Sequence, residues 1–377
     1  MPTIRIDYYE KNRLPLITGP VRKSAEQIRA HHPDALIFVR TGWLHGPHME
    51  LCVSSEAEID VSPQLQLIRN WLKEHPSTTQ LKADEYEMLS RKVGVLEGIG
   101  GPYLPLRPDN TAELVDYRQP RLVDGHEVLQ GSYARFLDRS APVLFRVAAL
   151  KSHDVSLATI VLLAMLARAA DQFEPEGLAR GYLSLQAHAD FFFANFDRSG
   201  HLRRQYECLA ETWTDQLELA VLGRPQITAH NSEAAAQVVE IMAIWEEVLA
   251  DAKAEIQRVI RTDKSWFDYN PSAIPDDLGD AEKYKEAFEV FSSAGIRTRK
   301  IEKGETLDGM LGSIDPAFFR SDNFQTLRVI LNLYYSFLRT LNVSPAERFC
   351  LCYLVASTFC RMRDSGKLAA VNHGVEI

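Results

Sequence analysis

The sequence lacks the features that mark several large classes of protein. Its longest apolar run, residues 155–170, is shorter than a membrane span and is interrupted by Thr159 and Arg168, so we expect a buried helix and no membrane segment. Basic residues are not in excess, because the formal net charge is −9 at pH 7, and this argues against broad binding of nucleic acid. The first ten residues are charged and strand-like, so no signal peptide is expected.

Cysteine is also scarce. There are five cysteines, an odd number, and they lie mostly within apolar runs: Cys52, Cys208, Cys350, Cys352 and Cys360. This usage is typical of reduced thiols, so a cytoplasmic location is expected. Cys350 and Cys352 are separated by one residue, whereas zinc and redox pairs are separated by two, and no second pair follows. The sequence therefore predicts no metal site.

Generic catalytic motifs are missing too. The chain has no Walker phosphate loop, no dinucleotide-binding fingerprint, no HExxH zinc motif and no nucleophile elbow. Residues 98–110 read GIGGPYLPLRPDN and are rich in glycine, but no strand-then-helix pattern surrounds them and no Lys-Ser/Thr follows. A connecting loop is therefore favoured over a phosphate loop, and no cofactor is expected.

The chain does have the size and composition of a globular protein. It has 377 residues, of which 46% are hydrophobic and 25% charged, enough for one large unit spanning residues 1–377. Strand patterns concentrate in residues 1–120 and helical patterns in residues 121–364, followed by a loose tail at 365–377. Such segregation predicts an α+β fold, with a β-rich N-terminal part of antiparallel strands and a mostly helical C-terminal part.

Alternation of apolar and polar residues predicts strands at residues 3–9, on both sides of the turn in 34–54, and at 112–117. Helices are predicted from apolar spacing and start signals. They cover 21–31, 64–73 with Ser62 as N-cap, 84–96, 126–137, 141–150 starting near Pro142, 155–170 after Asp154, the segment 181–197, 201–222, 231–261, 323–341 after Asp322, and 345–362 after Ser344. Residues 262–310 are more polar and are expected to form a surface excursion, either a lid or a substrate-facing loop.

The predicted hairpin, residues 34–54, holds unusual chemistry. Arg40 ends its first strand, His45 and His48 lie in or just after the turn, and Glu50 lies on the second strand. These side chains either line a binding site or lie along a solvated edge of the hairpin. Spacing alone favours the solvated edge.

Other candidate acids and bases are Tyr334 and Tyr335 on the penultimate helix, and Glu87 and Glu97 near the glycine-rich loop. A tyrosine pair in an apolar helix usually belongs to the core, with one hydroxyl in contact with water. A single histidine on a helix face, such as His188, is more often a core or interface residue than a ligand.

The hairpin also carries a resemblance to a known family. Its pattern, FVR followed by five residues and GPHMELCV, resembles the paired strands of the lanthipeptide-dehydratase elimination domain. Three further segments follow the same family pattern in order: IRIDYY near the N-terminus, GYLSLQAHADFFF from residue 181, and ERFCLCYLVASTFCRMR from residue 347. Together they span nearly the whole chain, so the resemblance implies an elimination-domain-like fold.

Two departures from that family bear on the reaction. The family uses arginines on the second strand of the pair to remove glutamate from glutamylated Ser or Thr, whereas this chain has Glu50 in that segment. An arginine fork suits a leaving carboxylate, and an acid repels it. The family's late histidine would fall within residues 352–358, which contain no histidine. Both departures argue against glutamate elimination.

A stand-alone branch, the thiopeptide pyridine synthases, is more similar because it has lost those arginines. The loop at residues 104–110, LPLRPDN, resembles a sequence of that branch. The resemblance implies a precursor peptide with a leader, in which two dehydroalanines are joined by a formal [4+2] cycloaddition, followed by loss of water and of the leader. Holding the two reacting groups close together in the right orientation supplies a large part of the rate acceleration of such a reaction.

The residues proposed for this chemistry come from the hairpin, the segment from residue 84 to the glycine-rich loop, the loop at 104–110 and the penultimate helix. The catalytic candidates are Tyr334, Tyr335, His48 and Glu97. The substrate-binding candidates are Arg40, His45, Glu87 and Arg107, and no metal ligand is proposed.

The sequence is also compatible with two other functions: a glutamate-eliminating lyase that forms half of a split dehydratase, and a non-catalytic partner that binds the precursor peptide. A partner dehydratase and a homodimer are further open expectations.

Overall fold

The computed structural model describes residues 2–97, 100–117, 129–197, 199–223, 225, 232–262, 318 and 321–368. The chain divides into two compact units. Of the described residues, 2–149 and 339–342 form the first, called here the strand unit. The helical unit contains 150–262, 318, 321–338 and 343–368.

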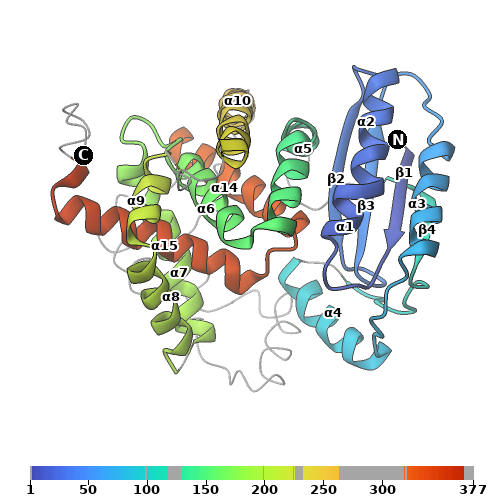
Figure 1. Cartoon of the computed structure of the whole chain (residues 1–377), viewed down its shortest axis with the longest axis horizontal. Coiled ribbons are helices and arrows are strands. Elements are labelled where there is room, and N and C mark those ends of the chain that lie inside the picture. Colours follow the sequence, from blue (N-terminus) through green and yellow to red (C-terminus); the bar gives the residue numbers. More distant parts are fainter. Residues whose placement is uncertain are drawn as a thin grey trace. The chain divides into compact units, whose positions relative to one another are not determined.

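The strand unit is built on a four-stranded sheet whose order is β2-β3-β1-β4 (Figure 1). Every neighbouring pair is antiparallel. The strands are β1 (Pro2–Asp7), β2 (Leu36–Gly42), β3 (His48–Ser54) and β4 (Thr111–Asp116). The strand predictions and the α+β fold class are therefore confirmed.

Side chains alternate between the two faces of this sheet. One face is apolar and includes Ile4 and Ile6 of β1 and Leu51 of β3, all fully buried. Helix α2 contacts β2 and buries Ile28, and helix α3 contacts β4 and buries Ile68. The helical segments of this part of the chain are α1 (Leu14–Leu16), η1 (Ile17–Val21), α2 (Arg22–His31), α3 (Ser62–Glu74) and α4 (Ala83–Glu97).

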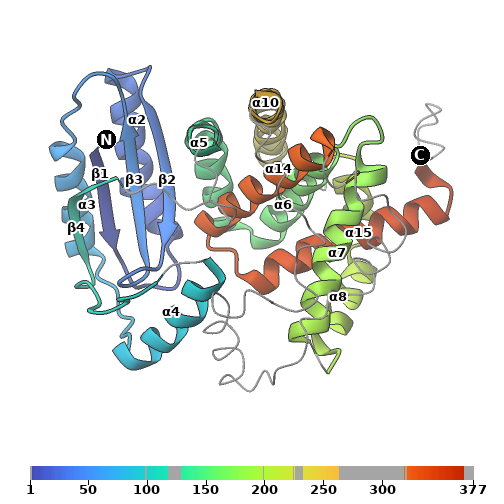
Figure 2. The same cartoon turned by 180° about the vertical axis from the view of Figure 1, so that it is seen from behind.

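The helices that follow are α5 (Gln130–His153), α6 (Val155–Ala170), α7 (Leu178–Phe196), α8 (His201–Thr212), α9 (Thr214–Val221), α10 (Ser232–Thr262), α14 (Asp322–Thr340) and α15 (Pro345–Asp364). Helix α6 is the predicted buried helix, and α7, α9, α10 and α15 contact it. Figure 2 labels α6 together with α7, α10 and α15. None of the helices in the described ranges has the length and apolarity that crossing a bilayer requires.

Two side chains donate hydrogen bonds to backbone carbonyls of α6. Trp245 Nε1 lies 3.0 Å from the Met165 oxygen, and the Tyr334 hydroxyl lies 2.6 Å from the Leu162 oxygen. Helix α7 approaches α6 so closely that a Cβ atom on Gly181 would lie 1.8 Å from the Ala170 oxygen. Glycine is therefore required at this contact, because any side chain would force the two helices apart.

Two of the helix starts are confirmed in detail. The Asp154 carboxylate accepts a hydrogen bond from the Leu157 amide at 2.9 Å. Ser344 and Glu347 form a reciprocal capping box at the start of α15. Ser62, in contrast, is not an N-cap: Val61 holds that position, and the Ser62 amide donates to Asp60 Oδ1 at 2.9 Å.

Other helix boundaries were wrong. The predicted helices 126–137 and 141–150 are one helix, α5, with Pro142 inside it. Buried Leu137 and Val143 flank the proline, so core packing on both sides outweighs the hydrogen bond that proline removes.

The predicted helix 201–222 is divided at Trp213 into α8 and α9. The hydroxyls of Thr212 and Thr214 bond to carbonyls of the preceding turn, which competes with the helical pattern there. Residues 126–128, 263–310 and 369–377, which include the predicted surface excursion and most of the tail, lie outside the described residues.

Candidate functional site

The second face of the sheet carries a row of charges. Strand register places four side chains opposite one another across the sheet, in the order Arg40, Glu50, Arg5 and Glu113, which we call the charged row. The signs alternate from β2 to β4, so each charge faces its opposite on the neighbouring strand. Within the row, Arg40 Nε lies 2.5 Å from Glu50 Oε2, and both side chains are nearly buried. The Arg40 guanidinium also lies 4.8 Å from the centre of the Tyr117 ring.

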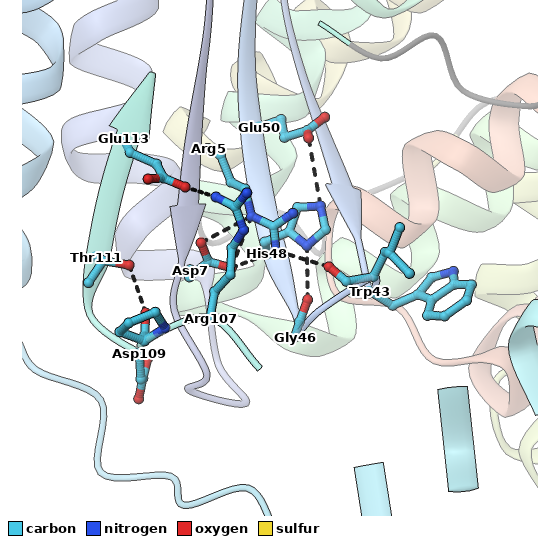
Figure 3. A network of polar contacts seen from close by, with 12 residues as sticks. Arg5, Asp7, Trp43, Gly46, His48, Glu50, Arg107, Asp109, Thr111 and Glu113 are labelled. Carbon is cyan, nitrogen blue, oxygen red and sulfur yellow. Dashed lines mark hydrogen bonds and ion pairs between the residues drawn. The ribbon is translucent and has the colours of Figure 1, made fainter. Parts of the chain in front are cut away.

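Arg5 connects this row to the hairpin loop (Figure 3). Its Nη2 donates to Asp7 Oδ1 at 2.8 Å and to the Leu44 carbonyl at 3.0 Å. Asp7 is 1% exposed, and burial raises the pKa of its carboxyl even though Arg5 acts to lower it. The buried pair therefore anchors the turn through fixed hydrogen bonds.

His48 is buried beside the same row. Its Nδ1 lies 2.9 Å from the Gly46 carbonyl and donates to it, because a carbonyl can only accept. Burial first, and then the charge of Arg5, lowers the pKa of His48 to about 3, so the imidazole is neutral at pH 7. A Cβ atom on Gly42, its register partner, would lie 2.3 Å from Nε2 of His48.

The loop at residues 103–110 lies against the hairpin. The Arg107 amide donates to the His45 carbonyl at 2.8 Å, and the Tyr9 hydroxyl donates to the Arg107 carbonyl. The Arg107 side chain forms an ion pair with Glu113 of the charged row (Figure 3). The structure thus brings together four of the predicted residues: the side chains of Arg40, His48 and Arg107, and the backbone carbonyl of His45.

Two other predicted residues lie elsewhere. Glu87 pairs with Arg91 one turn later on α4, at 2.7 Å. Glu97 is the last residue of α4, and its side chain is outside the described residues.

A second polar cluster lies in the helical unit and joins three helices. His188 of α7 has Nδ1 2.7 Å from the Tyr335 hydroxyl of α14, and that hydroxyl lies 3.4 Å from Sγ of Cys352 on α15. The Arg348 guanidinium, also on α15, lies 4.9 Å from the centre of the Tyr335 ring. We call these four residues the His188 cluster. As whole residues, His188 and Tyr335 are half-buried.

The protonation states in this cluster follow from its surroundings. Burial, followed by the charges of Arg348 and Arg328, lowers the pKa of His188 to about 4. Burial raises the pKa of Tyr335 well above its ordinary value and that of Cys352 to about 11. At neutral pH the cluster therefore contains a neutral imidazole beside a protonated phenol and a protonated thiol, which suits general acid–base chemistry.

The two predicted tyrosines have different surroundings. Tyr334 is fully buried, and its ring lies 5.5 Å from that of Trp245 in the core. Only Tyr335 meets another titratable side chain by a hydrogen bond within the described residues. Sequence reasoning assigned His188 to the core or an interface. No spacing rule could have found the pair, because His188 and Tyr335 are 147 positions apart.

Metal chemistry has no evident site among the residues that the structure describes. No group of three or more His, Cys, Asp or Glu side chains gathers there in a way that could hold a metal ion.

Comparison with known proteins gave matches among solved structures alone. No family model matches the sequence, and no curated protein matches it. The pyridine synthase TbtD, from thiomuracin biosynthesis, is similar over 96% of this chain and 98% of its own, with a TM-score of 0.67 and 20% identity. TsrL is similar over 97% of this chain and 95% of its own, with a TM-score of 0.61 and 14% identity. The chain therefore has the fold of these two proteins along nearly its whole length.

Proposed function

We propose that the protein is a tailoring enzyme for ribosomally made peptides that cyclises a dehydroalanine-containing precursor. The reaction is a formal [4+2] cycloaddition that forms a pyridine-type macrocycle, with loss of water and of the leader peptide. The observation that carries this proposal is the likeness to pyridine synthase TbtD, which covers 96% of this chain and 98% of that one. A match of whole chain to whole chain supports an enzyme of the same kind more strongly than a shared domain would.

The charged row supports cyclisation over glutamate elimination. An eliminating site needs a cation available for the leaving carboxylate. Here Arg40 is already engaged by Glu50, an internal carboxylate on the neighbouring strand. We propose that Arg40, His45, His48 and Arg107 hold the hairpin against the loop at 103–110 and so fix the positions of both segments.

The His188 cluster supplies the proton transfers that cyclisation requires. We propose that the Tyr335 hydroxyl donates to the reacting amide oxygen, which favours the iminol form of the amide. His188 is the matching acceptor, since its imidazole is neutral at working pH. The Cys352 thiol stays protonated and orients the phenol rather than attacking the substrate. The elimination of water and of the leader uses the same donor.

We place the enzyme in a reducing cytoplasm, where its five free cysteines would remain thiols. The precursor peptide is the proposed partner.

The test is turnover of a dehydrated, azole-bearing precursor that retains its leader, followed by mass spectrometry. The expected products are the released leader and a core peptide lighter by one water. Tyr335→Phe and His188→Gln should each lower the rate about 10²-fold or more. Tyr334→Phe is the matched control, because it removes a neighbouring hydroxyl from the core and leaves the cluster intact.

Two results would contradict the proposal. Release of glutamate from a glutamylated precursor would identify an eliminating lyase. Tight binding of the precursor without any mass change would identify a non-catalytic binding protein.

A further inference from the structure

Arg348 occupies an unusual place in the His188 cluster. Its guanidinium lies over two aromatic rings, 4.9 Å from the centre of Tyr335 and 4.6 Å from the centre of Phe349. The Phe349 ring in turn stacks on Phe192 of α7 at 4.5 Å, with an interplanar angle of 16°. The cation is therefore held by contact with two rings, and one of them is the Tyr335 ring, whose hydroxyl bonds to His188.

One donor of Arg348 gains no hydrogen bond from this placement. Its Nε is shielded from solvent and has no hydrogen-bond partner among the described residues. A buried donor without a partner costs about 1–3 kcal/mol, so a purely structural residue at this position would be better as an apolar side chain. An arginine at this position is explained if its positive charge is needed.

We propose that Arg348 is a positioning residue: its guanidinium, held over the Tyr335 and Phe349 rings, stabilises negative charge on the Tyr335 oxygen and disfavours a second positive charge beside it. This inference rests on the proposed function, because it gives Tyr335 the role of proton donor. When the phenol gives up its proton, the ring face becomes more negative and its attraction to the guanidinium strengthens. The same positive charge opposes protonation of His188, so the imidazole stays available as an acceptor.

The electrostatics of the neighbouring groups agree with this role. The charge of Arg348 acts to lower the pKa of His188, of Tyr335 and of Cys352 alike, against the upward effect of burial on the phenol and thiol. Arg328 of α14 is the other charged group that acts on His188 within the described residues, and it acts in the same direction. Removing Arg348 should therefore raise the pKa of His188, while burial and Arg328 still hold it below the ordinary value.

The test is the titration of His188 by NMR in the full-length protein, with the imidazole signal assigned by its loss in His188→Gln. Arg348→Met should move the midpoint upward, and Arg348→Lys, which keeps the charge, should restore it in part. Arg203→Met is the matched control. It removes a guanidinium that lies 4.7 Å from the Phe193 ring in the same unit and should leave the His188 midpoint unchanged. If Arg348→Met fails to fold, Arg348→Gln is the second neutral variant.

The activity readout separates this inference from the proposed function. With the precursor peptide, Arg348→Met should lower kcat at least about tenfold with little change in KM, and should shift the pH-rate profile upward. A raised His188 midpoint without any turnover by the wild type would support the role of Arg348 and contradict the proposed reaction. An unchanged midpoint in both neutral variants would overturn the inference, whatever the activity.

Discussion

Arg40 of β2 faces Glu50 of β3 directly across the sheet, with Arg40 Nε 2.5 Å from Glu50 Oε2 and both side chains nearly buried. Removing either partner leaves the other charge buried and uncompensated, so Arg40→Ala or Glu50→Ala should lower the free energy of unfolding by about 3–5 kcal/mol. The double variant Arg40→Met/Glu50→Leu should cost much less than the sum of the two. Chemical denaturation measures all three.

The exposed pair Glu87–Arg91 on α4 is the matched control, and its double alanine variant should change stability by about 0.5 kcal/mol or less. Additive losses at Arg40 and Glu50 would show that the two charges do not act as a pair. If the hairpin instead bound the substrate directly, Arg40→Ala would abolish turnover even at temperatures where the variant is fully folded.

Acid should destabilise the protein through two histidines, because the folded protein lowers the pKa of each. Their pKa values in the folded state are about 3 for His48 and about 4 for His188, against an ordinary value of 6.5. Below pH 6.5 the unfolded chain binds protons that the folded chain excludes, so stability falls as the pH falls toward 4. The loss is about 1.4 kcal/mol per pH unit for each histidine. Urea unfolding at pH 7 and pH 5 measures this slope.

His48→Gln and His188→Gln should each reduce that slope, and the two reductions should add because the residues belong to different units. A slope that neither substitution changes would mean that other groups control the acid sensitivity.

The adjacent tyrosines should separate stability from activity. Tyr334→Phe removes a buried hydrogen bond to the Leu162 carbonyl and should cost about 1 kcal/mol of stability without slowing turnover. Tyr335→Phe should cost a similar amount of stability, because its hydroxyl bonds to His188, but it should also remove the proton donor and stop turnover. Thermal unfolding and peptide turnover, measured on the same samples, check both. Equal loss of activity in the two variants would place the chemistry elsewhere.

The contact between α6 and α7 gives a prediction about packing. Gly181→Ala would place a methyl group 1.8 Å from the Ala170 carbonyl oxygen, and two well-packed helices cannot yield without loss of other contacts. We expect a loss of about 3 kcal/mol or more, or failure to fold. Gly100→Ala is the control, since nothing lies within 4 Å of its added carbon. A stable Gly181→Ala variant would contradict the close approach.

Much of the fold could be predicted because it is encoded locally. Alternation identified β1, both strands of the hairpin and β4, and the caps at Asp154 and Ser344 identified the starts of α6 and α15. The predicted helix boundaries were wrong where core packing opposes a local sequence signal. Pro142 predicted a helix start, but buried residues on both sides hold it within α5.

The candidate sites divide in the same way. Arg40, His48 and Glu50 lie within one hairpin, so their proximity follows from the chain itself. The alignment of Arg5 and Glu113 with them depends on strand order, which no local pattern specifies. The contact of His188 with Tyr335 depends on how α7 and α14 pack, and nothing in either segment indicates the other.

The fit of Gly42 against the His48 imidazole has an evolutionary consequence. Since a Cβ atom at position 42 would lie 2.3 Å from the ring, the glycine can acquire a side chain only in descendants that have first replaced the histidine with something smaller. In an alignment of close homologues these two columns should therefore covary, and the order of the two substitutions along any lineage should be histidine first.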